Sequence, residues 1–273
     1  MLLTINENKK MKSQTNKIIL KGVEYTQAEA DEIYNELLNP VQNAPPNKPN
    51  FSVGKNPQFI TDQNLYNEII KYLDKTFSNH KSNLSGKLNF TDGVMKGSNP
   101  DIAVAVDMFL KKQNIKHRIA TQRDLETKIQ MFKDCYEDTG LALRSTKNPN
   151  KSSAEHLYNQ IKKSNPKLKF PIFIELRDLE LDSNLNFNLT SQSKYKTADC
   201  LNWEDGTHYS QIDDYGLPKV EDASSPRQIW TRKDGLAGVY LDGGLDFDPS
   251  SGNVFDSDGN GRVVLVPAEG GAP

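Results

Sequence analysis

Positively charged and hydroxyl side chains follow three predicted strands of this chain, at the points where predicted helices begin. Cations and hydroxyls beside a helix N-terminus suit phosphate or carboxylate groups, because backbone N–H groups and the helix dipole favour negative charge at the same place. We therefore expect these residues to bind an anionic small molecule, for example a nucleotide. The candidate ligand-binding residues are Lys96, Ser98, Thr121, Arg123, Arg144, Ser145, Lys147, Lys151 and Ser152.

A structural explanation of the same residues stays open. The hydroxyls stand where helix caps are expected, and the Lys and Arg side chains are compatible with a solvated face. The chain contains no Gly-rich phosphate loop of the Gly-x-x-x-x-Gly-Lys or Gly-x-Gly-x-x-Gly type.

Asp92 is the best single candidate for a catalytic carboxylate or a metal ligand. It lies in Phe90-Thr91-Asp92-Gly93, at the end of a predicted strand, where an ordinary turn residue is an equally good explanation. Together with a divalent ion and the basic residues above, Asp92 would suit metal-assisted hydrolysis of a phosphoester. No serine-hydrolase elbow and no His-Glu-x-x-His zinc motif is present, so the sequence leaves open whether the protein is an enzyme.

The segment 256–261, Asp-Ser-Asp-Gly-Asn-Gly, resembles the first half of an EF-hand calcium loop. It places oxygen ligands at positions one, three and five and Gly at position six. The candidate ligands of a Ca or Mg ion are therefore Asp256, Asp258 and Asn260. The twelfth position, where an EF-hand loop has Glu, is Pro267, and a Val-rich segment stands where the second helix would begin. A β-hairpin turn explains the same six residues.

The elements that must position these candidates lie between Lys87 and Leu181, where four short apolar runs alternate with amphipathic stretches. Such alternation is typical of α/β proteins. We therefore predict an α/β fold, with a mostly parallel sheet built from repeated β-α units and a β-rich C-terminal extension. Strands are expected at 87–90, 115–120, 140–145 and 170–176. The carboxyl ends of parallel strands share one edge of a sheet, where ligands bind, so the candidates should converge there.

Local signals mark where the helices start. Ser98 with Asp101, and Thr121 with Asp124, have the spacing of capping boxes, and Ser152 or Ser153 is expected to cap a third helix. A further helix is expected over 63–77, because its apolar residues lie along one face.

Composition changes along the chain suggest three parts. Residues 1–57 read as an N-terminal appendage with a Pro-rich linker, and residues 58–181 as the α/β core. Residues 182–273 read as an acidic β-rich extension or a small second domain, because alternating apolar and polar residues replace the helical pattern.

The net charge of -2 conceals an asymmetry along the chain. Residues 1–170 contain 26 Lys and Arg against 18 Asp and Glu, a formal charge of +8, whereas residues 171–273 contain 8 against 18, a charge of -10. The two parts are able to neutralise each other by packing together. No basic run is interleaved with stacking aromatic residues, so a dedicated nucleic-acid surface is not indicated.

The remaining features indicate a soluble cytoplasmic protein. The two cysteines are too few for a disulfide framework, and the sequence has neither a recognisable signal peptide nor a membrane-spanning run. Aromatic residues among the acidic C-terminal segments suit either a protein-binding surface or a small β core. Our leading hypothesis is a non-catalytic protein that binds an anionic small molecule or a protein partner, and the alternative is the metal-assisted phosphoester hydrolase.

Overall fold

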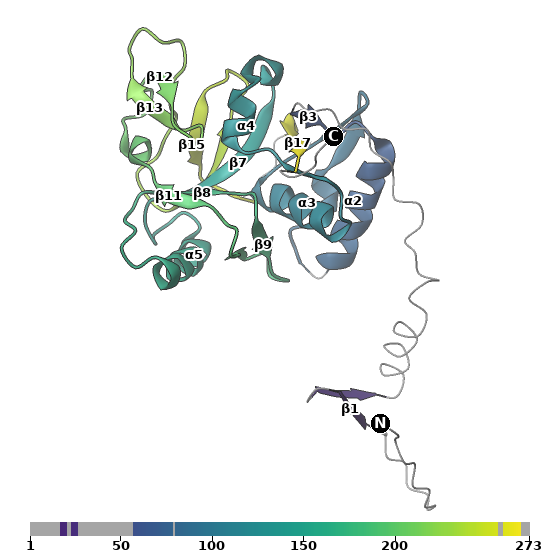
Figure 1. Cartoon of the computed structure of the whole chain (residues 1–273). Helices are drawn as coiled ribbons and strands as arrows, with labels where there is room; N and C mark the ends of the chain where they lie inside the picture. The colour runs from purple at the N-terminus through teal and green to yellow at the C-terminus, as the bar shows by residue number, and fades with distance from the viewer. Residues whose placement is uncertain (1–16, 21–22, 27–56, 79, 256–258, 269–273) are drawn as a thin grey trace, which may run out of the picture. The chain divides into compact units, whose positions relative to one another are not determined.

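The computed structural model describes residues 17–20, 23–26, 57–78, 80–255 and 259–268 (Figure 1). The chain divides into two compact units, residues 1–50 and 51–273. In the first unit, β1 (Lys17–Leu20) and β2 (Val23–Thr26) form an antiparallel hairpin. All candidate site residues belong to the second unit.

The main sheet of the second unit is centred on one long strand, β7. The strand order is β11-β8-β7-β14-β15, and each neighbouring pair in this order is antiparallel. A sixth strand, β16, pairs in parallel with the first two residues of β7. The bounds are β7 (Tyr136–Leu143), β8 (Ile172–Glu175), β11 (Tyr195–Thr197), β14 (Leu236–Leu241), β15 (Phe247–Ser251) and β16 (Gly261–Arg262).

Smaller antiparallel units surround this sheet. A three-stranded sheet has the order β3-β17-β6, with β3 (Gln58–Phe59), β17 (Val264–Pro267) and β6 (His117–Ile119). Three hairpins complete the strands. They are β4 (Asn89–Thr91) with β5 (Val94–Lys96), β9 (Leu179–Leu181) with β10 (Phe187–Leu189), and β12 (Tyr209–Ile212) with β13 (Pro218–Glu221).

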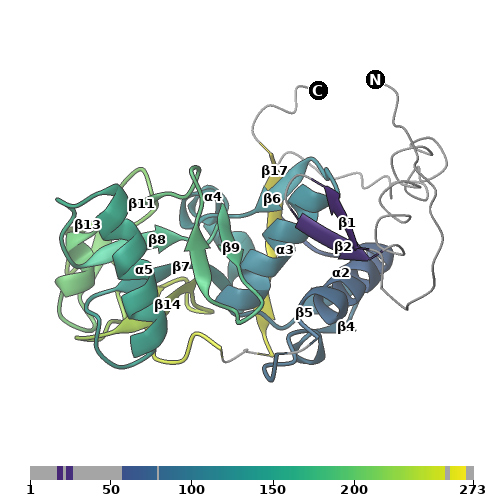
Figure 2. The same ribbon diagram turned by 90° about the horizontal axis from the view of Figure 1, so that it is seen from below.

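The described helices are α2 (Gln63–Thr76), α3 (Pro100–Lys112), α4 (Gln122–Glu126) and α5 (Lys151–Ser164), with 3-10 turns η1 (Ser85–Lys87), η2 (Ile129–Phe132) and η3 (Asp199–Asn202). Helix α3 is apolar around most of its circumference, so it is buried on most sides. Figure 2 shows α3 between β9 and α2. None of the described helices is long and apolar enough to cross a membrane.

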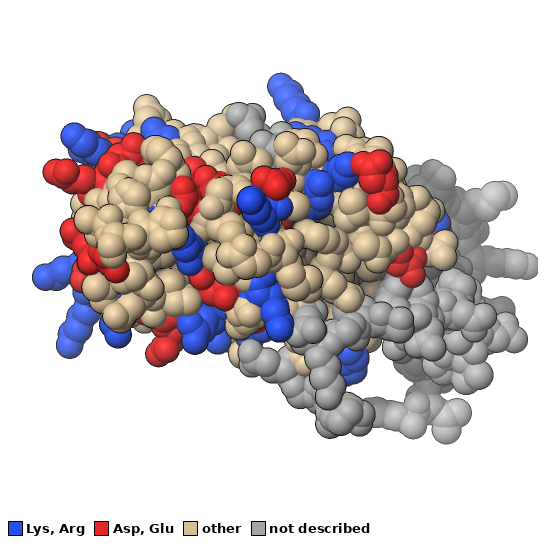
Figure 3. All heavy atoms as spheres, turned by 90° about the horizontal axis from the view of Figure 1, so that it is seen from above, with Lys and Arg blue, Asp and Glu red and all other residues tan. Residues whose placement is uncertain are grey.

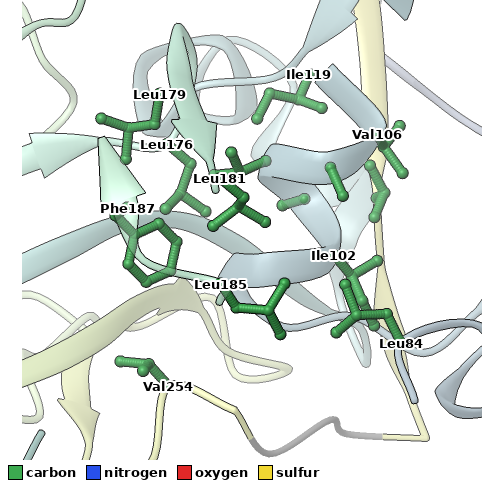
Figure 4. Close-up of a cluster of buried hydrophobic side chains, with 14 of the residues drawn as sticks. Leu84, Ile102, Val106, Ile119, Leu176, Leu179, Leu181, Leu185, Phe187 and Val254 are labelled. Atoms are coloured by element: carbon green, nitrogen blue, oxygen red, sulfur yellow. The ribbon is translucent and has the colours of Figure 1, made fainter. Parts of the chain in front are cut away.

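Three clusters of buried apolar side chains hold the second unit together. The largest joins α3 to β9 and β10, and includes Ile102, Val106, Leu181 and Phe187 (Figure 4). A second cluster contains Phe173, Val239 and Phe247. A third contains Leu125, Phe132 and Leu241. Strands β7 and β14 contribute to more than one cluster, so the main sheet is covered on both faces.

The predicted mostly parallel sheet is wrong, because the sheets are antiparallel. Within the described ranges, parallel pairing is confined to β16 with β7 and the isolated bridge between Ile229 and Phe247. The alternation of strand-like and helix-like segments was real, but it does not determine strand direction. Pairing between distant segments decides the direction, and β14, from the predicted C-terminal extension, lies directly beside β7.

The first predicted β-α unit shows the error most clearly. Asp92 and Gly93 both have positive φ angles, 55° and 73°, which is the backbone of a tight hairpin turn. The chain therefore folds back at once, and Val94–Lys96 pairs with Asn89–Thr91. Likewise, the partners of β6 and β3 come from β17, at the far end of the described chain.

The predicted helix caps had mixed outcomes. Thr121 and Asp124 form a complete capping box on α4, which confirms that prediction. Asn99, one residue after Ser98, caps α3 by accepting the Ile102 N–H at 2.8 Å. The N-cap of α5 is Asn150, so Ser152 and Ser153 lie inside the helix.

Ion pairs join the two oppositely charged parts of the chain. Lys111 Nζ lies 2.7 Å from Asp178 Oδ1, and Lys147 Nζ lies 3.9 Å from Asp234 Oδ1. On the face shown in Figure 3, acidic and basic side chains are interspersed. The opposite charges of the two parts are thus partly paired within the molecule.

Candidate functional site

Arg144 lies at the carboxyl end of β7 and is the most buried cation among the predicted site residues. Its side chain is 7 % exposed. Nε donates to the Leu201 carbonyl at 3.1 Å, Nη1 to the Pro249 carbonyl at 3.2 Å, and Nη2 to Thr231 Oγ1 at 2.5 Å. Burial lowers the pKa of Arg144 to about 10, so the guanidinium stays charged at neutral pH.

A second arginine, Arg232, lies next to Arg144. Its Nη1 donates at 3.3 Å to the carbonyl of Ser250, the residue after the Pro249 that accepts from Arg144. Its Nε is buried and has no hydrogen-bond partner among the described residues. The charge of Arg232 adds to the burial that lowers the pKa of Arg144. Neither arginine forms an ion pair with any residue of the described ranges.

Two loops meet at this point, and backbone hydrogen bonds hold them together. The Arg144 N–H donates to the Gly235 carbonyl at 2.9 Å, and the Gly235 N–H donates to Ser145 Oγ at 3.0 Å. Ser145 Oγ also accepts the Lys147 N–H at 3.2 Å. The Lys147 side chain is 76 % exposed, and its Nζ lies 3.9 Å from Asp234 Oδ1. Ser145 therefore shapes the loop, while Lys147 extends into solvent.

The N-terminus of α5 lies beside the same loops. Its N-cap, Asn150, makes no side-chain bond to the first turn, because its amide donates to the carbonyls of Leu236 at 2.7 Å and Gly252 at 3.1 Å. Lys151 and Ser152 lie in that first turn, and Lys151 Nζ is 3.7 Å from Glu155 Oε1. Among the described residues, no side chain caps the N–H groups of this turn.

Gly252 connects the helix to the arginines. Its carbonyl accepts from Asn150, and a Cβ built on it would come within 2.2 Å of Arg232 Nη1. The Arg232 guanidinium and the start of α5 therefore both lie against Gly252. We use the name basic site for Arg144, Ser145, Lys147, Lys151, Ser152 and Arg232.

The basic site has the chemistry of an anion-binding site. Two guanidinium groups lie within electrostatic range of each other and donate to neighbouring carbonyls. Neither forms an ion pair with a described residue, although the Asp248 carboxylate is also within electrostatic range of Arg144. Two lysines lie on the adjoining loop and helix, and the N-terminus of α5 is nearby. Guanidinium groups bind phosphate and carboxylate in a planar, two-pronged geometry, and a helix N-terminus favours the same negative charge.

The remaining predicted ligand residues lie elsewhere. Ser98 Oγ donates to Asp138 Oδ2 at 2.6 Å. Asp138 precedes Arg144 by six residues on an extended strand, which separates them by about 20 Å at the usual rise per residue. Lys96 forms an ion pair with Asp92 on the β4–β5 hairpin. Arg123 is exposed, and its Nη1 lies 3.4 Å from the Asp213 carbonyl.

The candidate catalytic residue Asp92 is exposed at the tip of the β4–β5 hairpin. The hydrogen bond and charge of Lys96 hold its pKa below the ordinary value, as for a paired surface carboxylate. Its positive φ angle is the backbone that the turn requires. The turn therefore accounts for its position and partner, and a catalytic role stays a prediction.

The predicted calcium loop is only partly described. Asp256 and Asp258 lie outside the described residues, and the carbonyl of Asn260 accepts the Tyr136 N–H at 3.4 Å. Within the described ranges, no three His, Cys, Asp or Glu side chains are placed so that they could hold a metal ion. The Ca or Mg site stays a prediction.

Sequence reasoning missed Arg232. A signal was present, because Arg232 and Lys233 form a basic pair in a strongly acidic part of the chain, directly before the Asp234-Gly235 turn. The proximity to Arg144 depends on the pairing of β14 with β7, which the predicted parallel sheet did not contain.

Comparisons with known proteins assign no family to this chain. No family model matches it, and neither a curated protein nor a solved structure matches it. The function of this chain must therefore be inferred from the geometry of the site.

Proposed function

We propose that this protein binds a small molecule through a phosphate or carboxylate group at the basic site. The observation that supports this function best is the pair Arg144 and Arg232, whose guanidinium groups donate to neighbouring carbonyls of β15 without an ion pair to a described residue. Two adjacent cations repel each other, and burial removes the water that would screen them. A bound anion would relieve both costs.

The buried Nε of Arg232 supports the same proposal. An N–H donor without an acceptor is costly in a protein interior, and an anion supplies acceptor oxygens. Arg144 has a different role, because its three bonds join β7 to η3, β15 and Thr231. In the proposed site Arg144 provides fixed positive charge, and Arg232 makes the direct contact.

Titration with inorganic phosphate and with acetate, followed by calorimetry and by thermal melting, tests the proposal. Wild-type protein should bind at least one of these anions and melt at a higher temperature in its presence. Arg232→Gln should weaken binding about tenfold or more, the usual effect of losing a hydrogen bond to a charged group. Chloride at equal ionic strength controls for general screening.

Lys233→Gln is the matched control, because it removes an equal charge from the next residue, which is exposed. It should retain most of the wild-type affinity. Equal losses in the two variants would point to general electrostatic attraction, and an unchanged affinity in Arg232→Gln would contradict the assignment of the contact.

The protein-partner and hydrolase hypotheses predict other results. A protein partner would be captured by the wild-type chain and would not compete with phosphate. A metal-assisted hydrolase would turn over a generic phosphoester in the presence of Mg²⁺ or Mn²⁺ and would lose that activity in Asp92→Asn. Neither result is expected if the basic site only binds its ligand.

A further inference from the structure

Two carboxyl groups near the amino end of β7 are buried, and within the described part of the chain they have no hydrogen-bond partner. Asp101, in the first turn of α3, is 0 % exposed, and Glu137, the second residue of β7, is 1 % exposed. None of their four side-chain oxygens has a hydrogen-bond partner among the residues that the structure describes. Both residues lie outside the basic site and are not used by the proposed function.

The groups that face Asp101 come from two elements. Lys87 of η1 is within electrostatic range, and its Nζ donates to the Phe255 carbonyl. Asp138 of β7 adds a like charge, and its Oδ2 accepts from Ser98 at 2.6 Å. The cation in electrostatic range is therefore bonded elsewhere, and the carboxylate in range opposes a second negative charge.

Glu137 points to the face of β7 opposite to that of Asp138, since consecutive strand residues point to opposite faces. Its surroundings are similar to those of Asp101. Arg262 of β16 faces it, but Arg262 Nη1 donates to the Gly261 carbonyl at 2.8 Å. Asp138 again contributes a like charge, and the Cys135 thiol lies within electrostatic range. No ion pair joins Glu137 to Arg262, although both residues are described.

A carboxylate in this position would be very costly. A buried ionised carboxylate without hydrogen bonds loses its hydration and gains nothing in return, whereas the protonated acid is neutral. Burial accordingly raises the pKa of Asp101 to about 8 and that of Glu137 to about 9, with Asp138 adding to both shifts.

We propose that Asp101 and Glu137 are protonated carboxylic acids in the folded protein and form a pH-dependent latch at the amino end of β7. The latch holds the first turn of α3 and strand β16 against β7 while both groups are neutral. Ionisation of either group opposes this packing, because the charge must then return to water. At alkaline pH the amino end of β7 therefore loses its packing before the carboxyl end, where the basic site lies.

The sign of the linkage follows from the protons bound in each state. Below about pH 4 both the folded and the unfolded chains carry these protons, so the groups have no effect on stability. As the pH rises, the unfolded chain releases its protons while the folded chain keeps them until about pH 8 to 9. Stability therefore falls with increasing pH across this range.

Replacement of Asp101 by Asn tests the latch, because the Asn side chain has the same shape as Asp and has no carboxyl group that could titrate. The equilibrium constant for folding of Asp101→Asn, relative to that of the wild type, should increase about tenfold for each pH unit between pH 5 and pH 7.5. Denaturant titrations at several pH values measure this ratio. A ratio that does not change with pH would overturn the proposal, since Asp101 would then be ionised in the folded protein.

Asp107→Asn is the matched control on the same helix. Asp107 is equally buried, but its carboxylate is 2.6 Å from Lys111 Nζ and accepts the N–H groups of Ile119 at 3.3 Å and Asp178 at 3.2 Å. This variant should be less stable than the wild type throughout the same pH range.

Infrared spectroscopy gives a readout that does not depend on unfolding. The folded wild type at pH 6.5 should show the carbonyl band of protonated carboxyl groups, and the band should weaken in Asp101→Asn and in Glu137→Gln. An unchanged band in the folded variants would also overturn the proposal, and if one variant fails to fold, the other gives the test.

Discussion

The two ends of β7 bury ionisable groups in opposite ways. At the carboxyl end, Arg144 donates three hydrogen bonds from three different nitrogens, whereas at the amino end the oxygens of Glu137 and the nearby Asp101 accept none from any described residue. The difference follows from acid–base chemistry. A carboxylate becomes neutral by taking a proton, but a guanidinium stays charged at neutral pH and must be hydrogen-bonded when buried.

The contrast also separates two kinds of site. The basic end keeps its charge, has an exposed lysine on its loop, and is suited to a ligand of opposite charge. At the acidic end Asp101 and Glu137 are buried, and in the proposed latch they respond to pH. Four substitutions along β7 test this comparison.

Arg144→Met should have the largest effect. The variant leaves the carbonyls of Leu201 and Pro249 without their donors, and we expect a loss of about 4 kcal/mol in the free energy of unfolding. Urea denaturation measures this change in the free energy of unfolding. Lys147→Met, on the exposed side of the same loop, should change stability by less than about 0.5 kcal/mol. Similar values for the two variants would mean that Arg144 is not bonded as described.

Gly140→Ala tests the middle of the strand, where the two ends are joined. A Cβ at this position would lie 2.3 Å from Phe173 Cε2 and 3.0 Å from the Ile174 carbonyl, so β8 would have to move. We expect a loss of about 3 kcal/mol, as for overpacked cores. Gly238→Ala on the adjoining strand is the control, because its closest contact would be an ordinary 3.4 Å. A smaller loss at Gly140 than at Gly238 would contradict the close packing of β7 on β8.

Glu137→Gln should stabilise the protein at neutral pH and have little effect in acid. The pKa of Glu137 is about 9 in the folded chain and near 4.5 when unfolded, so the wild type loses stability as the pH rises between these values. We expect a gain of about 3 kcal/mol at pH 7 and almost none at pH 4. Thermal and urea unfolding at both pH values measure it. An equal gain in stability at pH 7 and pH 4 would contradict the explanation by titration of Glu137.

Thr139→Val should have the smallest effect. Thr139 Oγ1 donates to Gln122 Oε1 at 2.9 Å, between the two ends of β7, and its loss should cost about 1 kcal/mol. Thr207→Val, a half-buried position, should change stability by less than about 0.5 kcal/mol. If both variants matched the wild type in urea, the bond from β7 to α4 would contribute nothing measurable.

Local sequence signals predicted several elements correctly because they act over a few residues. The Thr121–Asp124 capping box is present, and the apolar face of the predicted 63–77 helix is buried at Leu65, Ile69 and Leu73 of α2. Similarly, Arg144, Ser145, Lys147 and Lys151 lie in one region partly because they are neighbours in the chain.

The strand directions and the second arginine were not predictable in this way. The hairpin turn at Asp92-Gly93 was recognised as a turn, but its returning strand has only three residues and carries little pattern. The approach of Arg232 to Arg144 depends on two segments almost ninety residues apart, and no local propensity determines such a pairing.

The amino-acid sequence by itself determined where most helices and strands form, where α4 begins, and which residues carry charge. Short-range forces are sufficient for those features, since capping, turn geometry and apolar periodicity involve residues close in the chain. Only the tertiary structure decided that the sheets are antiparallel, that Arg232 lies beside Arg144, and that Asp101 and Glu137 lose both water and hydrogen bonds. These features arise from long-range pairing and burial, which depend on the whole fold at once.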